Sequence, residues 1–520
     1  MGRVFLYDTT LRDGAQTEGV LFLCKDKIEL LKRLDAFGMD FVEGGWPGSN
    51  PCDDEFFKTS AEMELKNSKL VAFGSTSRHG TPADEDPGLK TLASCSAEWC
   101  CIFGKAWDLH GVDALGITLE DNLKLVRDSV SFLRRSGKRV IFDAEHFFDG
   151  FAFNMGYALD TIRAAAEAGA EWVVLCDTNG GSLPDAVEEA VREARKAVDV
   201  PLGIHCHNDS DLATSCTLAA VRAGCTMVQG TVNGIGERCG NANLCTVAPN
   251  LSLKMGMDLG RADLASMTDL SRFVGEVANM VPNPGMPYVG SRAFAHKSGM
   301  HISAISKNPR TYEHVEPSSV GNDRRVLVSN MAGRTSISEK LRELGLEGGD
   351  DDSEIRDMVK RLESRGYQFE GADASFELLV RRLRGELEPK FEIAGFRIYT
   401  DDREGGTRSE ASIKVSDRKG HVAHTAADGN GPVNALDNAL RKGLACFFPE
   451  LDDVKLVDYK VRVLDEGEGT ETGVRVLIRS TDGREDWTTV GVSVNIIQAS
   501  LTALEESIQY ALMRRPRTDR

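Results

Sequence analysis

The feature that most constrains the fold of this chain is a regular alternation of short apolar runs with longer amphipathic segments over its first 280 residues. The runs are rich in β-branched and aromatic residues, whereas the segments between them repeat apolar residues every three or four positions, as amphipathic helices do. Eight runs occur, at residues 4–7, 41–46, 70–73, 99–103, 139–142, 172–176, 202–205 and 227–232. Eight β/α units in about 250 residues predict a TIM barrel over residues 1–280. A doubly wound open sheet is the structural alternative, but no Gly-x-Gly-x-x-Gly turn follows the first run.

The pattern changes after residue 280. Residues 281–287 form a cluster of proline, glycine and asparagine that ends the barrel, and amphipathic helices are expected at about 336–344 and 353–365. We therefore predict a small helical subdomain over residues 281–390. From about residue 391 strand patterns dominate, and two similar units each end in a helix, which predicts an α+β domain with internal pseudo-symmetry over residues 391–520.

The charge of the chain limits its partners. A formal net charge of −18 argues against a nucleic-acid partner or an anionic membrane surface. No apolar run approaches the ~20 residues of a membrane-spanning helix. We therefore expect a soluble cytoplasmic enzyme that acts on small metabolites, without nucleic-acid or membrane partners.

Two histidines at the end of the seventh run indicate where the chemistry lies. His205 and His207 are two residues apart, so in a strand both imidazoles point to the same face, as two nitrogen ligands of a divalent metal would. A pair of hydrogen-bonded core histidines is the alternative. A barrel gathers the C-terminal ends of all its strands at one mouth. The polar residues just beyond the other runs are Arg12, Asp13, Glu43, Ser75, Lys105, Glu145, Asp177, Thr178, Asn233 and Asn241. Together they predict an active site of metal ligands and carboxylates.

Three motifs at predicted strand ends carry a family resemblance. The first is Asp-Thr-Thr-Leu-Arg-Asp-Gly-Ala-Gln at residues 8–16, the second is the His-x-His pair, and the third is the glycine-rich stretch at residues 230–243. In this order they resemble the DRE-TIM metallolyases, which condense or cleave acyl-CoA thioesters. That family includes isopropylmalate, homocitrate and citramalate synthases and hydroxymethylglutaryl-CoA lyase.

The resemblance implies a metal centre and a site for a 2-oxo acid. Asp13, His205 and His207 would be metal ligands, with the Asn241 side-chain carbonyl as a further ligand or close neighbour. Such a set suits Mn²⁺, Mg²⁺ or Zn²⁺, which would act as a Lewis acid on the keto oxygen. Arg12 would balance charge on that oxygen, with a structural ion pair as the alternative. Thr178 would hydrogen-bond the substrate carboxylate.

The second substrate in the synthases of this family is acetyl-CoA, whose methyl group must lose a proton. Glu145 lies where the synthases carry a catalytic glutamate, and His301 resembles a synthase histidine that reaches the mouth of the barrel from the following subdomain. We predict that these two residues form the general base. An ordinary surface histidine is the alternative for His301. Tyr312 matches a tyrosine in the same region of the synthases.

The C-terminal domain separates synthases from lyases. Residues 428–435 and 491–500 resemble the regulatory dimerisation domain of isopropylmalate and citramalate synthases, which implies a homodimer and an end-product amino acid, isoleucine, as a possible effector.

Residues 43–51, 101–110 and 145–150 resemble the citramalate synthase branch, which implies that pyruvate and acetyl-CoA give citramalate and CoA for isoleucine synthesis. Trp46, Trp107, Phe147 and Phe148 would favour the methyl group of pyruvate if they line the pocket, and core packing is their alternative. Two other functions stay open. One is 2-isopropylmalate synthesis from 2-oxoisovalerate, with homocitrate synthesis as a weaker variant, and the other is a non-catalytic paralogue that senses an amino acid.

Overall fold

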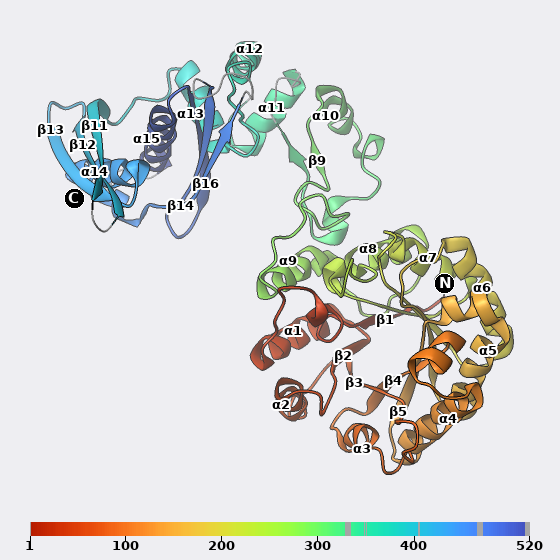
Figure 1. The fold of residues 1–520 in the computed structure, drawn as a ribbon. Coiled ribbons are helices and arrows are strands. Elements are labelled where there is room, and N and C mark those ends of the chain that lie inside the picture. The colour runs from red at the N-terminus through yellow and green to blue at the C-terminus, as the bar shows by residue number, and fades with distance from the viewer. Residues whose placement is uncertain are drawn as a thin grey trace. The chain divides into compact units, whose positions relative to one another are not determined.

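The computed structural model describes residues 2–327, 334–347, 349, 351–403, 406–464 and 472–514. The chain divides into two compact units (Figure 1). One consists of Met1–Phe294 with His314–Arg324, and the other of Ala295–Glu313 with Arg325–Arg520.

The first unit is a closed barrel of eight parallel strands in chain order, so the predicted TIM barrel is confirmed. The strands are β1 (Phe5–Asp8), β2 (Phe41–Gly45), β3 (Lys69–Ser75), β4 (Trp99–Lys105), β5 (Arg139–Glu145), β6 (Trp172–Asp177), β7 (Leu202–Cys206) and β8 (Met227–Gly230). Each overlaps one of the predicted runs. Pairing of Phe5 with Met227 and of Asp8 with Gly230 closes the ring between β1 and β8.

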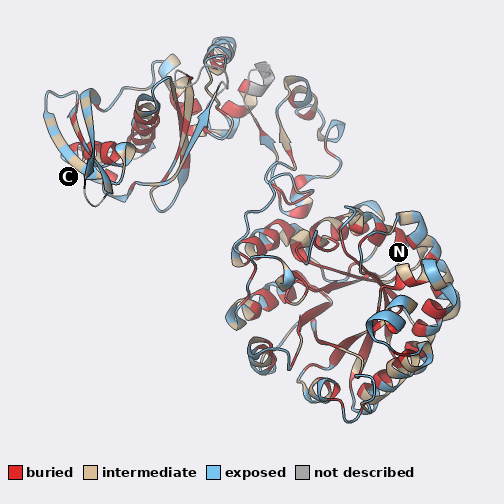
Figure 2. Cartoon of the chain, in the orientation of Figure 1, coloured by how far each residue is buried: buried red, intermediate tan, exposed pale blue. Residues whose placement is uncertain are grey.

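Helices surround the barrel (Figure 1). They are α1 (Cys24–Phe37), α2 (Pro51–Ser60), α3 (Pro87–Ser94), α4 (Leu119–Arg135), α5 (Phe147–Glu167), α6 (Pro184–Ala197), α7 (Ala213–Ala223), α8 (Leu244–Pro249) and α9 (Met267–Val277). Side-chain caps begin several of them; the Asn50 side chain, for example, accepts a hydrogen bond from the Asp53 amide at the start of α2. Figure 2 shows that the barrel strands are buried and that the surrounding helices are exposed on the side that faces away from the strands.

The barrel strands bury both of their faces, because successive side chains alternate between the interior of the barrel and the layer beneath the helices. Tyr7, Phe41, Trp99 and Met227 belong to the cluster inside the barrel. The larger core lies between strands and helices and contains Leu6 among many others. This core holds the strand ends in place and so positions the site at the mouth.

The second unit begins with a helical part. Its helices are α10 (Gly299–Ile305), α11 (Arg334–Glu343), α12 (Asp352–Glu363) and α13 (Asp373–Leu383), and the two-residue strands β9 (Ala295–His296) and β10 (Arg325–Val326) pair in parallel. Helices α11 and α12 match the two predicted helices, whereas α10, α13 and the short strands were not predicted. Ile337, Ile355 and Phe376 share a core with Val490, so this part packs against the C-terminal sheet.

The C-terminal part repeats a three-stranded antiparallel sheet followed by a helix; a repeated strand-rich unit that ends in a helix was predicted, but the three-stranded antiparallel sheets were not. The first copy consists of β11 (Glu392–Arg403), β12 (Gly406–Ser416), β13 (Val422–Gly429) and α14 (Pro432–Ala445). The second consists of β14 (Lys455–Val463), β15 (Val474–Thr481), β16 (Asp486–Ser493) and α15 (Ile496–Arg514). Ile413, Leu436 and Leu504 lie in their common core.

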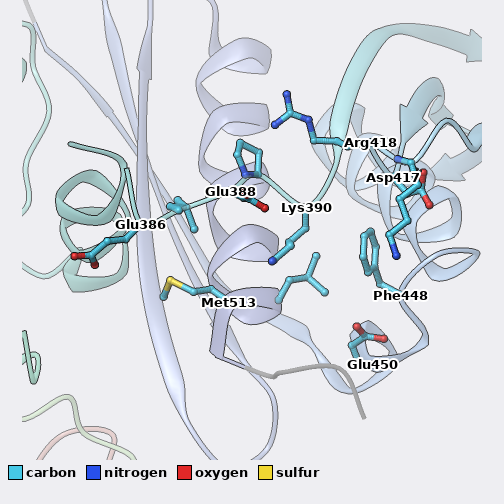
Figure 3. Close-up of a pocket in the computed structure, with 12 residues that line it drawn as sticks. Glu386, Glu388, Lys390, Asp417, Arg418, Phe448, Glu450 and Met513 are labelled. Atoms are coloured by element: carbon cyan, nitrogen blue, oxygen red, sulfur yellow. Dashed lines mark hydrogen bonds between the residues drawn. The ribbon is translucent and has the colours of Figure 1, made fainter. Parts of the chain in front are cut away.

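A cavity of about 670 Å³ lies in this second unit, where the segment before β11 meets the turn after β12 and the end of α15 (Figure 3). Charged side chains of both signs line it, including Lys390 and Asp417, together with apolar ones such as Phe448 and Met513. None of the predicted site residues lines this cavity. Among the residues that the structure describes, no helix has the length and apolar composition needed to cross a membrane.

Candidate active site

A pocket of about 230 Å³ lies at the C-terminal ends of the barrel strands. Its lining includes six predicted site residues, namely Arg12, Asp13, Glu145, Thr178, His205 and His207, and also Gln16, Trp46, Phe73, Phe103, Asp143, Cys176, Glu237 and Arg238. Residues separated by more than 200 positions in the sequence therefore meet at this mouth because the barrel closes. The location is the one in which TIM barrels place their active sites.

The predicted metal ligands form a compact cluster. Asp13 follows β1, His205 lies on β7 and His207 comes directly after it. One ligand atom from each of the three residues lies within 4.8 Å of the other two. His205 Nε2 is 3.4 Å from both Asp13 Oδ2 and His207 Nε2. A backbone bridge pairs His207 with Asn241, which is buried and donates from its side-chain Nδ2 to the Ile235 carbonyl oxygen at 3.3 Å, but Asn241 does not line the pocket. Two ligands at the usual ~2.1 Å from a tetrahedral metal are about 3.4 Å apart, so the spacing suits a shared cation.

Unpaired polar atoms in this cluster support the same interpretation. Asp13 Oδ2 and Asn241 Oδ1 are buried and make no hydrogen bond; His207 Nδ1 is also unpaired, but the atom of that ring that faces His205 is Nε2. A buried polar atom without a partner costs about 1–3 kcal/mol, so native structures seldom leave several together. The donor set of one carboxylate, two imidazoles and one amide oxygen therefore fits a divalent metal ion.

The protonation states also suit metal ligands. Burial opposes ionisation of Asp13, but nearby Arg12, His205 and His207 outweigh it and lower the pKa of the carboxyl. Burial, helped by His205 and Arg238, lowers the pKa of His207 to about 3. Asp13 is thus an anion and His207 a neutral imidazole near neutral pH, which are the forms that bind metals.

Arg12 is held rigidly at the edge of this cluster. Its Nη1 lies 2.8 Å from Asp13 Oδ1, its Nε donates to Glu43 Oε1 at 2.6 Å, and its guanidinium lies 3.9 Å from the ring centroid of Phe73. Glu43 is fully buried and also accepts a hydrogen bond from the Tyr7 hydroxyl at 2.6 Å. Glu43 was noted as a polar residue near the end of its strand, but its function as the partner of Arg12 was not predicted. A glutamate within an otherwise apolar strand is the signal that could have found it.

Thr178 lines the pocket with its hydroxyl proton free to donate, since its Oγ1 accepts a hydrogen bond from the His146 amide at 2.9 Å. Arg238 donates to the Thr178 carbonyl oxygen at 2.8 Å and to both carboxylate oxygens of Asp209 at 2.8 and 3.0 Å. Arg238 therefore ties together the segments that follow β6, β7 and β8. It was missed at the sequence level because nothing in the glycine-rich stretch shows which way its side chain points.

Glu145 ends β5 and forms an ion pair with Lys105 at the end of β4. His301 and Tyr312 lie in the second unit, where their rings stack with centroids 4.0 Å apart and both side chains are exposed. The structure thus brings His301 and Tyr312 to each other. Glu145 belongs to the first unit and His301 to the second, and their pairing stays a prediction.

The aromatic wall of the pocket differs from the prediction. Trp46 lines the pocket as expected, but its neighbours there are Phe73 and Phe103, at centroid distances of 5.6 and 5.9 Å. Phe147 and Phe148 are buried in the core beneath the helices, so the alternative of core packing holds for these two residues.

The local backbone explains where these rings go. At His146 it adopts a left-handed conformation, with φ of 59°, and α5 begins at once, so the two phenylalanines that follow enter the core instead of the mouth. Trp107 does not line the pocket either, and stacks on the His110 ring with centroids 5.4 Å apart.

Two further polar residues lie beneath the metal ligands and were missed. Gln229 on β8 is fully buried and contacts both His205 and Asp143 of β5. Burial, together with the neighbouring Glu43, raises the pKa of Asp143 to about 6. Their signal in the sequence is a polar residue within an apolar strand, which by itself does not reveal the face on which it lies.

Comparison with known proteins places each part of the chain. The HMGL-like family profile matches residues 3–277, the homocitrate synthase post-HMGL domain-like profile matches 288–367, and the LeuA allosteric (dimerisation) domain profile matches 370–512.

Full-length relatives agree with these assignments. The chain is 51% identical over 518 residues to an (R)-citramalate synthase of Geobacter sulfurreducens, covering 98% of each chain. It is 49% identical over 519 residues to an (R)-citramalate synthase of Aquifex aeolicus, again covering 98% of each chain. A probable 2-isopropylmalate synthase of Methanopyrus kandleri is 33% identical, with 99% of each chain covered. The chain therefore belongs to the HMGL-like family and, through this full-length similarity, groups within it with the (R)-citramalate synthases.

Proposed function

We propose that this protein condenses acetyl-CoA with pyruvate to form (R)-citramalate and CoA, in isoleucine synthesis. The observation that carries the proposal is the cluster of Asp13, His205 and His207 beside Arg12 at the barrel mouth, in a chain about half identical to enzymes of that name over nearly all of its length. 2-Isopropylmalate synthesis is the second candidate, but the relative of that name has the lower identity of 33%.

The proposed reaction has two steps, a condensation and the hydrolysis of a thioester. A proton leaves the methyl group of acetyl-CoA, that carbon bonds to the keto carbon of pyruvate, and the former keto oxygen gains a proton. Water then adds to the thioester carbonyl and CoA leaves as a thiol. Acetyl-CoA, pyruvate and water thus give (R)-citramalate and CoA.

Asp13, His205, His207 and Asn241 would hold the divalent metal ion that the family implies. Such an ion supplies Lewis-acid polarisation of a keto group. Mn²⁺, Mg²⁺ and Zn²⁺ all accept this mixture of oxygen and nitrogen donors.

Arg12 and Thr178 orient the 2-oxo acid. The rigid guanidinium of Arg12 faces the pocket, where it stabilises negative charge that develops on the keto oxygen. The Thr178 hydroxyl donates to the substrate carboxylate, since its oxygen already accepts the His146 amide proton. Arg238 holds Thr178 in place.

Glu145 and His301 together remove the methyl proton in this proposal, with Tyr312 stacked on His301. The Glu145 carboxylate faces the pocket, and Lys105 fixes its direction. The wall of Trp46, Phe73 and Phe103 limits the size of the keto-acid side chain.

We further propose three parts for the chain, a catalytic barrel at residues 1–280, a helical subdomain at 281–390 and a regulatory dimerisation domain at 391–520. The dimerisation-domain match supports a homodimer. Isoleucine is the proposed effector, as the end product of the proposed pathway. We place the enzyme in the cytoplasm with its two small-molecule substrates.

The experiment that tests the function measures CoA release from acetyl-CoA with Mn²⁺ or Mg²⁺, offering pyruvate, 2-oxobutyrate, 2-oxoisovalerate and 2-oxoglutarate in parallel. We expect the highest kcat/KM with pyruvate. Preference for 2-oxoisovalerate would support isopropylmalate synthesis instead. No release with any of the four, together with binding of isoleucine, would support the amino-acid sensor.

A further inference from the structure

A glutamine inside the barrel lies directly behind the proposed metal ligands. Gln229 is two residues after Met227 on β8, so both side chains point to the barrel interior, and Gln229 is fully buried. In the parallel ladder it pairs with His205 of β7. The proposed reaction assigns no task to this residue.

Its amide connects two groups on opposite sides. Gln229 Oε1 lies 2.8 Å from His205 Nδ1, and Gln229 Nε2 donates to Asp143 Oδ1 at 3.1 Å. Asp143 is almost completely buried on β5. A hydrogen-bonded chain thus runs from Asp143 through Gln229 to His205.

In this hydrogen-bonded chain, the chemistry of the three side chains decides which atom donates and which accepts at each contact. A carboxylate only accepts hydrogen bonds, so Asp143 takes the amide N–H of Gln229 and leaves the amide oxygen toward His205. A reversed amide would place two oxygens 3.1 Å apart at Asp143. Facing an acceptor, His205 must carry its proton on Nδ1. Its Nε2 lone pair then points to Asp13 and His207.

We propose, on the basis of the function proposed above, that Gln229 is a positioning residue that fixes His205 as the Nδ1–H tautomer and thereby prepares its Nε2 to bind the metal ion. Asp143 acts one step further back by orienting the Gln229 amide. Partners of this kind behind a metal-binding histidine typically change metal affinity about 10- to 100-fold when they are removed.

The test compares Mn²⁺ affinity, measured by calorimetry at about pH 8 and therefore without any substrate or turnover. Gln229→Met keeps the length of the side chain and removes both hydrogen bonds, and we expect it to weaken Mn²⁺ binding about 10- to 100-fold. Gln229→Glu is the conservative variant. Its carboxyl would share one proton with Asp143, as two adjacent buried carboxylates do, and would still accept from His205, so we expect affinity within about threefold of the wild type.

Thr161→Val is the control. Thr161 is fully buried on α5, outside the lining of the pocket, and donates a hydrogen bond to the Tyr157 carbonyl oxygen at 3.0 Å, so this variant also loses a buried interaction but leaves His205 untouched. We expect its Mn²⁺ affinity to equal that of the wild type. Equal affinity in Gln229→Met and the wild type would overturn the proposal, and so would Gln229→Glu binding no better than Gln229→Met.

A measurement on the wild type avoids any question of folding in the variants. In metal-free protein labelled with ¹⁵N-histidine, the His205 imidazole, identified by comparison with His205→Asn, should show the Nδ1–H tautomer. The Nε2–H tautomer would overturn the proposal. If the wild type itself binds no Mn²⁺ and needs none for CoA release, the proposed metal site fails, whereas wild-type binding with an unaffected Gln229→Met refutes only the role of Gln229.

Discussion

Truncation of Phe103 to alanine tests whether the aromatic wall sets the size of the accepted 2-oxo acid. Phe103 lies near the end of β4 and lines the pocket, where its ring stacks on Phe73 at 5.5 Å and lies edge-on to Trp46 at 5.9 Å. Apart from Cys176, the other residues that line the pocket are charged or polar, and one of them, Arg12, stacks on the Phe73 ring of this wall. The wall is therefore the apolar surface that a substrate alkyl group would contact.

The expected magnitude follows from these contacts. A hydrophobic pocket discriminates by about 1–3 kcal/mol per methylene group, and 2-oxobutyrate exceeds pyruvate by one methylene. Removing the Phe103 ring should thus raise the kcat/KM ratio of 2-oxobutyrate to pyruvate by about 10-fold or more. Loss of two aromatic pairs at about 0.5–1.5 kcal/mol each should lower the free energy of unfolding by roughly 1–3 kcal/mol.

The assay follows CoA release with pyruvate, 2-oxobutyrate and 2-oxoisovalerate for the wild type and for Phe103→Ala. Phe148→Leu is the control, because Phe148 is buried in the outer core and should affect stability without changing the substrate ratio. An unchanged ratio in Phe103→Ala, in a protein that still folds and turns over pyruvate, would refute the argument that the wall sets selectivity.

Three further predictions concern the proposed metal ligand His207, the arginine Arg238 and the buried carboxyl of Asp8. His207→Ala should abolish Mn²⁺ binding in calorimetry and CoA release, while the circular dichroism spectrum stays that of the wild type; retained activity would exclude His207 as a ligand. Arg238→Ala should raise the KM for pyruvate several-fold because Thr178 loses its support, whereas the exposed Arg127→Ala should leave it unchanged. Burial raises the pKa of Asp8 to about 7, so the carboxyl is protonated in the folded state over a range in which it ionises in the unfolded chain. From pH 4 to pH 7 the free energy of unfolding of the wild type should therefore fall relative to that of Asp8→Asn, by roughly 4 kcal/mol at 1.36 kcal/mol per pKa unit. Urea melts at several pH values measure both free energies. A difference between the two proteins that stays constant over this pH range would contradict the prediction.

The path of the chain could be predicted because its signals are local. Each barrel strand is a short apolar run of its own, and the helices between runs carry their own periodicity and capping residues such as Asn50. The shared direction of His205 and His207 follows from the two-residue period of a strand. Asp13 lies close to these histidines in space although they are 192 positions or more away in the sequence. This proximity could be predicted only from closure of the barrel and from the resemblance of the motifs.

The directions of the aromatic rings and the buried polar contacts were decided by the tertiary structure. Barrel strands are buried on both faces, so their residues are apolar on both sides and the pattern does not reveal which face is the interior. Sequence patterns therefore could not show that Phe103 on β4 faces the pocket, and the direction of Phe148 was decided by the turn at His146 that begins α5. They also could not show that Gln229 lies behind His205. The sequence by itself determined the order of the elements and the residue types available for chemistry, because propensity and periodicity are local. Only the packing of eight strands into a closed ring determined which side chains face one another, because that depends on contacts between residues far apart in the chain.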